Sequence, residues 1–396
     1  MKTKNTRRAF IKKSALAGMA IPILGSSLIA CKSKNEKEIL DASFNKLKIL
    51  ILGGTSFLGP HQIAYALKRG HSVTTFTRGK TLPSVHAELF DQVEQLIGDR
   101  EDNLKALENR KWDVVIDNSG HKSEWTKATA NLLKDNADIY MYTSSTGVYY
   151  PYLTDNIKED KKLVLSMPEG LTEDEQYEQK YGVMKGNSEL EAIKAFGDKR
   201  TIIVRPTYMI GPADKTDRFI HWPIRLSKGG EVLVPGTPED LVQYIDVRDV
   251  AEWFIRLAEN NQYGTYNAVG PKEKQNMNGF ITEAEKTFNI EHNFVWIDNY
   301  DFLVENKVYF SVPWIPSFGK NYGTARVSNS KAINSGLTLR PIKETVKDTY
   351  DWWTSESISD ERRSKYETNP DNLIVKEAEM LKIWKSAKFN TKVEKN

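Results

Sequence analysis

A tyrosine and a lysine four residues apart are the side chains best suited to proton transfer in this sequence. Tyr181 and Lys185 lead into a segment with a helical pattern, and their spacing places both side chains on one face of a helix. A free phenol has a pKa of about 10, and a nearby ammonium lowers it by favouring the phenolate. The pair could accept the proton of a secondary alcohol beside a hydride acceptor. The alternative is an ordinary surface turn of a helix, because this spacing is common by chance.

A hydroxyl-rich stretch supplies a third candidate catalytic group. Residues 139–149 are predicted to form a strand that ends in hydroxyl side chains, among them Ser144 and Ser145. We expect Ser145 to hydrogen-bond the substrate oxygen and Ser144 to contact a cofactor. The other donors of Lys185 would hold the ribose hydroxyls of that cofactor. Together, Ser145, Tyr181 and Lys185 predict oxidation or reduction of an alcohol carbon.

These catalytic groups need a cofactor held beside them, and a strand, a glycine turn and a helix at residues 47–70 are predicted to hold it. The apolar residues 47–52 predict a buried parallel strand, and residues 61–69 predict a helix that ends at Gly70. In the turn, Gly53 permits the tight bend, the small Ser56 lets the backbone approach a diphosphate, and Gly59 lets the helix pack on the strand. The diphosphate would bind the free N–H groups at the helix start. The remaining predicted contacts in this turn are Thr55, Phe57 and Leu58.

Further strands and their exits are predicted at residues 71–80, 95–100 and 112–121, and residues 131–138 complete a helix before the strand at 139–149. This alternation predicts an α/β fold, a doubly wound parallel sheet whose strand ends share one rim. Cofactor contacts are expected on that rim, at Arg78, Asp99, Asn118, Ser119, Pro206 and Thr207.

The choice between NAD and NADP depends on the end of the second strand. NAD-binding proteins usually carry an acid there, and this chain has Thr77 followed by Arg78. Arg78 could bind a 2′-phosphate, which favours NADP and leaves NAD open.

These motifs together resemble the NAD-dependent epimerase/dehydratase family of extended short-chain dehydrogenases. Gly53, Ser56 and Gly59 resemble its glycine motif, with Ser56 as a departure, and Tyr181 and Lys185 match its Tyr-x-x-x-Lys. Further similar segments lie at residues 205–212, 244–251, 266–270 and 340–352. The resemblance implies a Rossmann fold with a smaller C-terminal substrate lobe, and an NAD(P)-dependent oxidoreductase or isomerase.

One departure from the family bears on the reaction. Its sugar-nucleotide dehydratases carry Thr-Asp-Glu at the hydroxyl site, whereas this chain has Ser145, Thr146 and Gly147. Without those acids, dehydration by that route is disfavoured. Epimerisation, or simple oxidation or reduction, of a sugar or related small molecule remains. The alternative from another class is a non-catalytic sensor that binds the cofactor.

The N-terminus predicts export and a lipid anchor. Residues 6–12 read Thr-Arg-Arg-Ala-Phe-Ile-Lys, an apolar stretch follows, and residues 28–31 end in Cys31, the only cysteine. Residues 1–31 are therefore predicted to be a twin-arginine signal peptide with a lipobox, and residues 32–46 a linker. The protein would be a periplasmic or membrane-anchored lipoprotein, acylated at Cys31. We further expect a tightly bound nicotinamide restored within each cycle, because no freely exchanging pool is expected outside the cytoplasm.

Charge argues against nucleic acid as a partner. Residues 1–30 hold six lysines and arginines and no acid, so the formal charge of +3 becomes −3 without them. RNA binding therefore fits poorly. The histidines lack ligand spacing, so no metal is predicted. The expected partner is a small-molecule substrate, and a homodimer is left open.

The rest of the chain is divided into a Rossmann domain at 47–206 and a substrate lobe at 207–390, with 240–265 returning to the sheet. The charged segment 151–180 lies between Ser145 and Tyr181, and it is either a lid or a solvated insertion. Arg218 and Arg225 in the lobe could meet an anion.

Overall fold

The computed structural model describes residues 45–393. The predicted signal peptide, Cys31 and all but the last two residues of the linker lie outside this range. No helix of the described part is long and apolar enough to cross a membrane.

A seven-stranded parallel sheet with the order β10-β6-β5-β4-β1-β2-β3 forms the centre of the fold. This order is that of a doubly wound nucleotide-binding sheet, so the predicted fold class is confirmed. The strands are β1 (Lys48–Leu52), β2 (Ser72–Thr77), β3 (Glu94–Ile97), β4 (Trp112–Asp117), β5 (Ala137–Thr143), β6 (Thr201–Pro206) and β10 (Gly264–Ala268).

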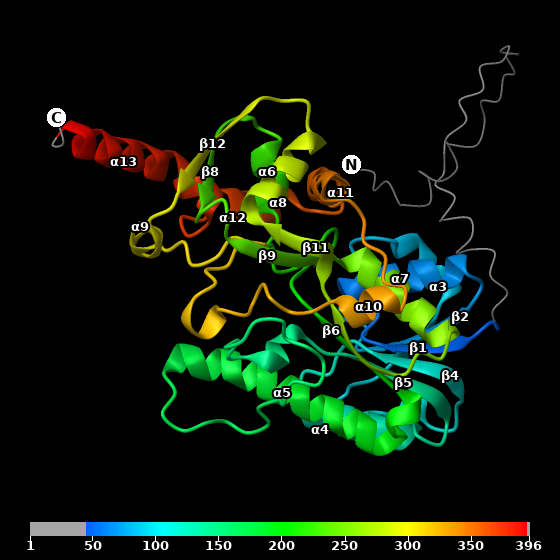
Figure 1. Cartoon of the computed structure of the whole chain (residues 1–396). Coiled ribbons are helices and arrows are strands. Elements are labelled where there is room, and N and C mark those ends of the chain that lie inside the picture. The colour runs from blue at the N-terminus through cyan, green and yellow to red at the C-terminus, as the bar shows by residue number, and fades with distance from the viewer. Residues whose placement is uncertain (1–44, 394–396) are drawn as a thin grey trace, which may run out of the picture. The chain divides into compact units, whose positions relative to one another are not determined.

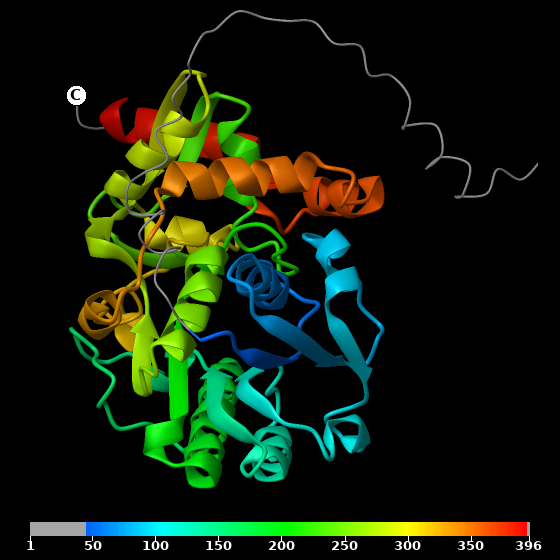
Figure 2. The same cartoon turned by 90° about the vertical axis from the view of Figure 1, so that its right-hand side faces the viewer.

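Helices cover both faces of the sheet (Figures 1 and 2). One layer holds α3 (Leu58–Lys68) and α7 (Val247–Glu259), and the other holds α4 (Ser123–Leu133) and α5 (Glu173–Phe196). The alternation within β1 explains this arrangement. Ile49 and Ile51 belong to the core beneath α3 and α7, while Leu50 and Leu52 belong to the core beneath α4 and α5. A strand buried on both faces needs the continuous apolar run that the sequence shows.

The lobe lies on the opposite side of the sheet from α4 and α5 in both views. It contains a three-stranded sheet, β11-β9-β7, and a two-stranded sheet, β12-β8. Its strands are β7 (Met209–Ile210), β8 (Gly230–Pro235), β9 (Leu241–Asp246), β11 (Gly270–Asn276) and β12 (His292–Ile297). Its helices are α6 (His221–Leu226), α8 (Met277–Ala284), α9 (Tyr300–Glu305), α11 (Ile342–Thr354), α12 (Asp360–Thr368) and α13 (Leu373–Val393). Helix α10 (Ser330–Asn334) instead packs against β10 of the main sheet.

Short 3-10 helices occur in both parts. They are η1 (Ala87–Gln92), η2 (Lys105–Leu107), η3 (Thr146–Tyr149), η4 (Asp198–Arg200), η5 (Glu285–Thr287) and η6 (Gly319–Asn321). The return of the chain to the main sheet, expected at 240–265, consists of α7 and β10, whereas β9 belongs to the small sheet.

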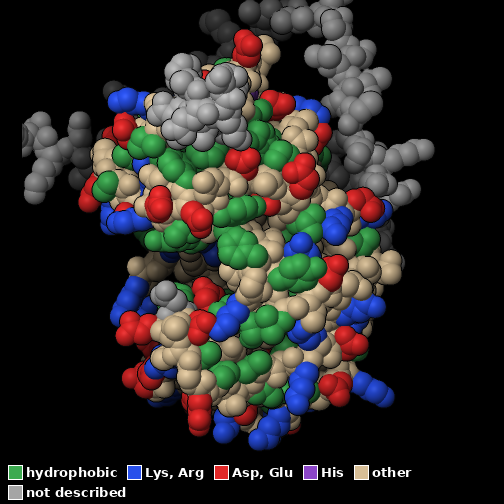
Figure 3. Space-filling view, turned by 60° about the vertical axis from the view of Figure 1, so that its left-hand side comes forward, with side chains coloured by type: hydrophobic (Ala, Val, Ile, Leu, Met, Phe, Trp, Pro, Cys, Tyr) green, Lys and Arg blue, Asp and Glu red, His purple; other side chains and the backbone are tan. Residues whose placement is uncertain are grey.

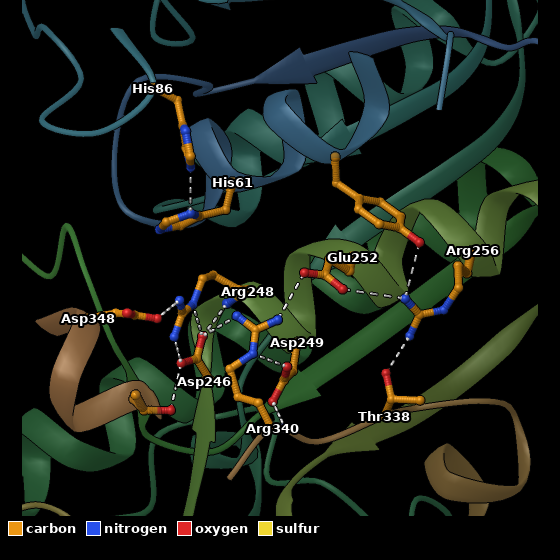
Figure 4. A network of polar contacts seen from close by, with 12 residues as sticks. His61, His86, Asp246, Arg248, Asp249, Glu252, Arg256, Thr338, Arg340 and Asp348 are labelled. Carbon is orange, nitrogen blue, oxygen red and sulfur yellow. Dashed lines mark hydrogen bonds and ion pairs between the residues drawn. The ribbon is translucent and has the colours of Figure 1, made fainter. Parts of the chain in front are cut away.

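A buried ion-pair network joins β9 and α7 to α11 and the segment before it (Figure 4). The carboxylate of Asp246 accepts hydrogen bonds from Arg248 at 2.7 Å and from Thr345 at 2.7 Å. Arg340 lies 2.8 Å from Asp249 and also faces Asp246. Burial alone would raise the pKa of Asp246, but Arg248 and Arg340 outweigh it and hold the pKa below its usual value. Two of the segments that carry the family resemblance, 244–251 and 340–352, therefore contact each other.

Candidate active site

The glycine turn after β1 forms the floor of a cavity of about 450 Å³ at the carboxyl ends of the strands. Gly53 has a φ of 85°, a conformation that favours glycine. A Cβ on Gly59 would lie 2.5 Å from the carbonyl oxygen of Gly54, so only glycine fits where α3 meets the turn. The first turn of α3 has no side-chain cap and no acid. Within this turn, Gly59 donates its N–H to the Ser56 carbonyl at 3.1 Å and Pro60 has no N–H, so Leu58 supplies the N–H that an anion could bind.

This cavity fits the dinucleotide that the sequence implies. Of the predicted cofactor contacts, those that line it are Gly53, Thr55, Ser56, Phe57, Leu58, Arg78, Asp99, Asn118 and Ser119. Gly59, Ser144, Pro206 and Thr207 are not among its lining residues, and neither are Tyr181 and Lys185. Gly59 packs against the backbone of Gly54, on the side of the glycine turn away from the cavity. Pro206 is the last residue of β6, and the chain continues through Thr207 into the lobe.

Neighbouring side chains hold the polar rim of the cavity in place. The Asn118 amide donates to Gln62 of α3 at 2.6 Å and accepts from Thr143 of β5 at 2.7 Å. Ser119 accepts a hydrogen bond from Arg100 at 3.1 Å. Arg100 also forms a buried ion pair of 2.6 Å with Asp117. The sequence analysis did not single out Arg100, although it directly follows the Gly-Asp turn.

Ser145 and Tyr181 meet at Gly147. The backbone N–H of Gly147 donates to the Ser145 hydroxyl at 3.0 Å, and a Cβ on Gly147 would lie 3.0 Å from the Tyr181 ring. Helix α5 approaches this turn just as closely, because a Cβ on Gly182 would lie 2.5 Å from the Gly147 carbonyl oxygen. Two glycines thus bring the phenol against the serine turn, and Tyr181 keeps 42% of its surface exposed. Neither glycine was singled out from the sequence.

Lys185 lies beneath this pair and is buried. Its ammonium donates to the Thr143 carbonyl at 3.0 Å and lies 6.0 Å from the centroid of the Tyr181 ring. Burial alone would lower the pKa of Lys185, but Tyr142, Tyr181 and Asp117 raise it above its usual value. The ammonium therefore stays charged at neutral pH. Because Thr143 lines the cofactor cavity, Lys185 lies between that cavity and the phenol.

Ser144 faces away from the cofactor cavity. Its hydroxyl donates to Glu189, one helical turn beyond Lys185 on α5, and both side chains are buried. Glu189 also accepts two hydrogen bonds from Arg205 of β6, at 2.9 Å and 2.6 Å. This network ties α5 to the ends of β5 and β6, which fixes the helix that carries Tyr181.

The segment 151–180 is anchored at its start and helical at its end. Ile157 is buried and exchanges backbone hydrogen bonds with Arg326 and Ser328. Helix α5 begins at Glu173, eight residues before Tyr181, with a capping box between Thr172 and Glu175. That signature was present in the sequence, although the helix was expected to begin near Tyr181.

Apolar side chains are exposed on both sides of the candidate site. Tyr177 lies one turn before Tyr181, and Phe318 and Tyr322 lie in the lobe. Lys320, between the latter two, forms an ion pair with Glu175 of α5. On one face of the molecule, hydrophobic side chains gather beside a hollow between its upper and lower parts (Figure 3).

The lobe residues singled out from the sequence have different roles. Arg225 is buried and bonds internally, to Glu377 and to the carbonyl of Gly229, so it is not available to a ligand. Arg218 lies over the Tyr208 ring at 5.4 Å and lines a second cavity. Among the described residues, no group of three or more histidine, cysteine or acidic side chains could hold a metal ion.

Fold and cavity together define a dinucleotide-binding protein with a candidate alcohol-redox site. The chain belongs to the NAD dependent epimerase/dehydratase family, which it matches over residues 49–269.

One curated relative and two solved structures illustrate what the chain is similar to. The chloroplast stem-loop binding protein of 41 kDa b from Arabidopsis thaliana is 30% identical over 243 residues, which are 57% of this chain and 59% of that protein. Enzyme WbmH of Bordetella bronchiseptica, in complex with NAD+, is 15% identical with a TM-score of 0.57, over 79% of this chain and all of that one. UDP-glucose 4-epimerase of Bifidobacterium longum, with NAD+ and UDP, is 18% identical with a TM-score of 0.55, over 78% and 98%. At these identities the two structures show the fold alone.

Proposed function

We propose that this protein is an NAD(P)-dependent epimerase or oxidoreductase that acts on a secondary alcohol of a sugar or related small molecule. The observation that carries the proposal is the meeting of Ser145, Tyr181 and the Lys185 ammonium beside the cofactor cavity. A nicotinamide bound in the cofactor cavity would supply hydride transfer at the alcohol carbon. Tyr181 takes and returns the hydroxyl proton, Ser145 hydrogen-bonds the substrate oxygen, and Lys185 keeps a positive charge next to the phenol.

The first experiment identifies the cofactor. The mature protein is purified after export, denatured, and the released nucleotide is identified by mass. Near-stoichiometric NAD or NADP supports a cofactor that stays bound, and sugar epimers and glycosides are then screened as substrates. An empty protein that binds added cofactor favours a dehydrogenase that exchanges it. A protein that binds neither nucleotide contradicts the catalytic proposal.

The second experiment tests the phenol. Tyr181→Phe removes the proton acceptor and keeps the ring against Gly147, so turnover should fall at least about 100-fold while nucleotide binding persists. Tyr177→Phe, one turn earlier on the same exposed helix face, is the matched control and should keep full activity. If Tyr181→Phe leaves every activity unchanged, the protein is better described as a cofactor-bound sensor.

The preference between NAD and NADP rests on Arg78, which is exposed on the rim of the cofactor cavity. Arg78→Ala should weaken NADP binding and leave NAD binding unchanged. Equal effects on both nucleotides would remove the argument for NADP, and the NAD-bound structural neighbours already support NAD.

The proposal extends to the compartment. A twin-arginine signal at residues 1–31 and acylation at Cys31 would place the enzyme in the periplasm, anchored to a membrane. Cys31→Ser should release the exported protein from the membrane fraction. Light scattering of the mature protein would decide between a monomer and a homodimer.

A second candidate function follows from the curated relative, whose name describes a stem-loop binding protein. The alternative is that this chain binds RNA on the same scaffold. Fluorescence anisotropy with a labelled stem-loop RNA tests it in the presence of saturating NAD. Binding that is sensitive to salt, with no turnover of any alcohol, would favour this alternative.

A further inference from the structure

Helix α5 carries a further acid–base candidate one turn before Tyr181. Glu178 precedes the phenol by three residues, so the two side chains are neighbours on one face of the helix. The helix is packed on the segment after the serine turn at this level, because the buried Gln179 donates a hydrogen bond to the Tyr150 carbonyl at 3.4 Å. Glu178 nevertheless keeps part of its surface exposed, so a ligand can reach its carboxyl group.

Two tyrosines place this carboxyl group beside the phenol. Tyr152 lies in the segment after the serine turn, and Tyr208 lies where the chain enters the lobe. Burial raises the pKa of both tyrosines, and the charges of Glu178 and Tyr181 each raise it further. A charge acts on its neighbours in this way only over a short distance. Glu178 and Tyr181 therefore face the same space, between the serine turn and the start of the lobe.

The Glu178 carboxyl group has no hydrogen bond or ion pair with any residue that the structure describes. Glu175, one turn earlier on α5, differs in this respect, because it pairs with Lys320 and accepts the backbone N–H of Thr172. Burial raises the pKa of Glu178, and no nearby cation opposes this rise. A pKa closer to neutral pH than that of a surface glutamate suits a group that both takes and returns a proton.

The ketone that the proposed oxidation forms would give this carboxyl group a role. A carbonyl makes the C–H bond of the adjacent carbon acidic, because the electron pair left behind can move onto the carbonyl oxygen. Ser145 and the protonated Tyr181 already hydrogen-bond that oxygen in the proposed function, so they would also stabilise the enolate. A base on the same side as Tyr181 is then sufficient to break the C–H bond.

We propose that Glu178 is the catalytic base that removes the proton from the carbon next to the oxidised alcohol, and that the substrate then loses the substituent one carbon further by β-elimination. The C–H electron pair becomes the new C=C bond, the substituent leaves with its own bonding pair, and Glu178 returns the proton to it. One carboxyl group suffices for this sequence, whereas inversion of the carbon needs a second group on its opposite face. The inference rests on the proposed function and adds the class of substrate: an alcohol with a leaving group two carbons away.

Proton exchange on a ketone tests this base without the redox step. Methyl 3-oxo-β-D-glucopyranoside is incubated in heavy water with the full mature protein and saturating NAD, which fills the cofactor cavity and cannot reduce the ketone. The proton on the second ring carbon lies on the same face as the methoxy group, so one probe reports both steps. NMR measures deuterium at that carbon in the recovered ketone, and released methanol measures the elimination. Both should appear faster than in a blank without protein.

Glu178→Gln keeps the shape of the side chain and removes the base, so exchange and methanol release should both fall at least about 100-fold. Glu173→Gln, an exposed acid at the start of the same helix, is the matched control and should react as the wild type does. Glu178→Asp keeps a carboxyl group and should recover part of the exchange. Because Glu178 makes no internal bond, Glu178→Gln should keep the melting temperature and the NAD affinity of the wild type, so a loss of exchange is not a loss of fold.

If the wild type exchanges no faster than the blank, or if Glu178→Gln exchanges as fast as the wild type, the inference is wrong. Exchange that inverts the carbon and releases no methanol would also overturn it. The proposed function is judged separately, by the released nucleotide and by the oxidation of alcohols in Tyr181→Phe, because neither measurement involves this proton.

Discussion

The close approach of α5 to the serine turn makes a quantitative prediction for Gly182→Ala. The new Cβ would lie 2.5 Å from the Gly147 carbonyl oxygen and 3.6 Å from the Val148 Cα. An ordinary contact between carbon and oxygen is more than half an ångström longer, and a backbone oxygen cannot rotate away. Helix and turn must therefore separate by roughly 1 Å, which displaces Tyr181 from Ser145. A misplacement of about 1 Å costs roughly 100-fold in rate.

Gly186→Ala, one turn further along α5, is the matched control. Its nearest neighbours would be two side chains, Leu165 at 3.1 Å and Leu163 at 3.5 Å, and side chains can move. Both variants gain about 1 kcal/mol of helix propensity, and only Gly182→Ala has a backbone clash, which costs about 1–3 kcal/mol. In urea unfolding, Gly182→Ala should therefore be less stable than Gly186→Ala by about 1–3 kcal/mol.

The assay combines urea unfolding with turnover of the first substrate that the screen identifies. Gly182→Ala should lose kcat with little change in nucleotide affinity, because the cradle after β1 is untouched. Equal stability and equal kcat in the two variants would refute the idea that the Gly147–Gly182 contact positions Tyr181.

Three other predictions concern buried ionisable side chains. Glu189→Gln leaves Arg205 without its charged partner, so the free energy of unfolding measured in urea should fall by about 3–5 kcal/mol. Glu191→Gln, on the same helix, is the control and should leave the free energy of unfolding almost unchanged. Equal effects of the two variants would mean that the Glu189–Arg205 ion pair does not stabilise the fold. Arg100→Gln leaves the buried Asp117 without its cation and frees the Ser119 hydroxyl, so both the free energy of unfolding and the affinity for NAD should fall. An unchanged NAD affinity would separate Arg100 from the cofactor site. Burial lowers the pKa of His61 from 6.5 to about 4, so the unfolded chain binds the proton more tightly and stability is lost as the pH falls through this window. Between pH 7 and pH 4.5 the wild type should lose about 2 kcal/mol more than His61→Asn in urea unfolding, and parallel losses would contradict this account.

The sheet could be predicted from the sequence because each strand carries its own signal. The apolar run of β1, the glycine turn and the segments at 112–118 and 139–149 are local patterns, and the doubly wound order follows from the handedness of their crossovers. The cofactor cavity follows in turn, because strand ends on one rim must converge. Nine of the predicted contacts line it for this reason.

The roles of Ser144 and Arg225 could not be read from the sequence, because they depend on partners distant in the chain. Ser144 was expected to contact the cofactor, but Glu189, 45 residues later, accepts its hydroxyl proton in a hydrogen bond. Arg225 was expected to be free for an anion, but Glu377, 152 residues later, neutralises it. A side chain that is chemically suited to a ligand is equally suited to an internal ion pair, and only the fold decides between them.

The same reasoning separates the two kinds of cation in the lobe. Arg225 and Arg362 both have carboxylate partners, so their charges are already compensated inside the protein. Lys215, Arg218 and Lys365 line a cavity, and among the described residues no carboxylate pairs with them. Lys215 and Lys365 are exposed, so water stabilises their charges, whereas the buried guanidinium of Arg225 needs a carboxylate beside it.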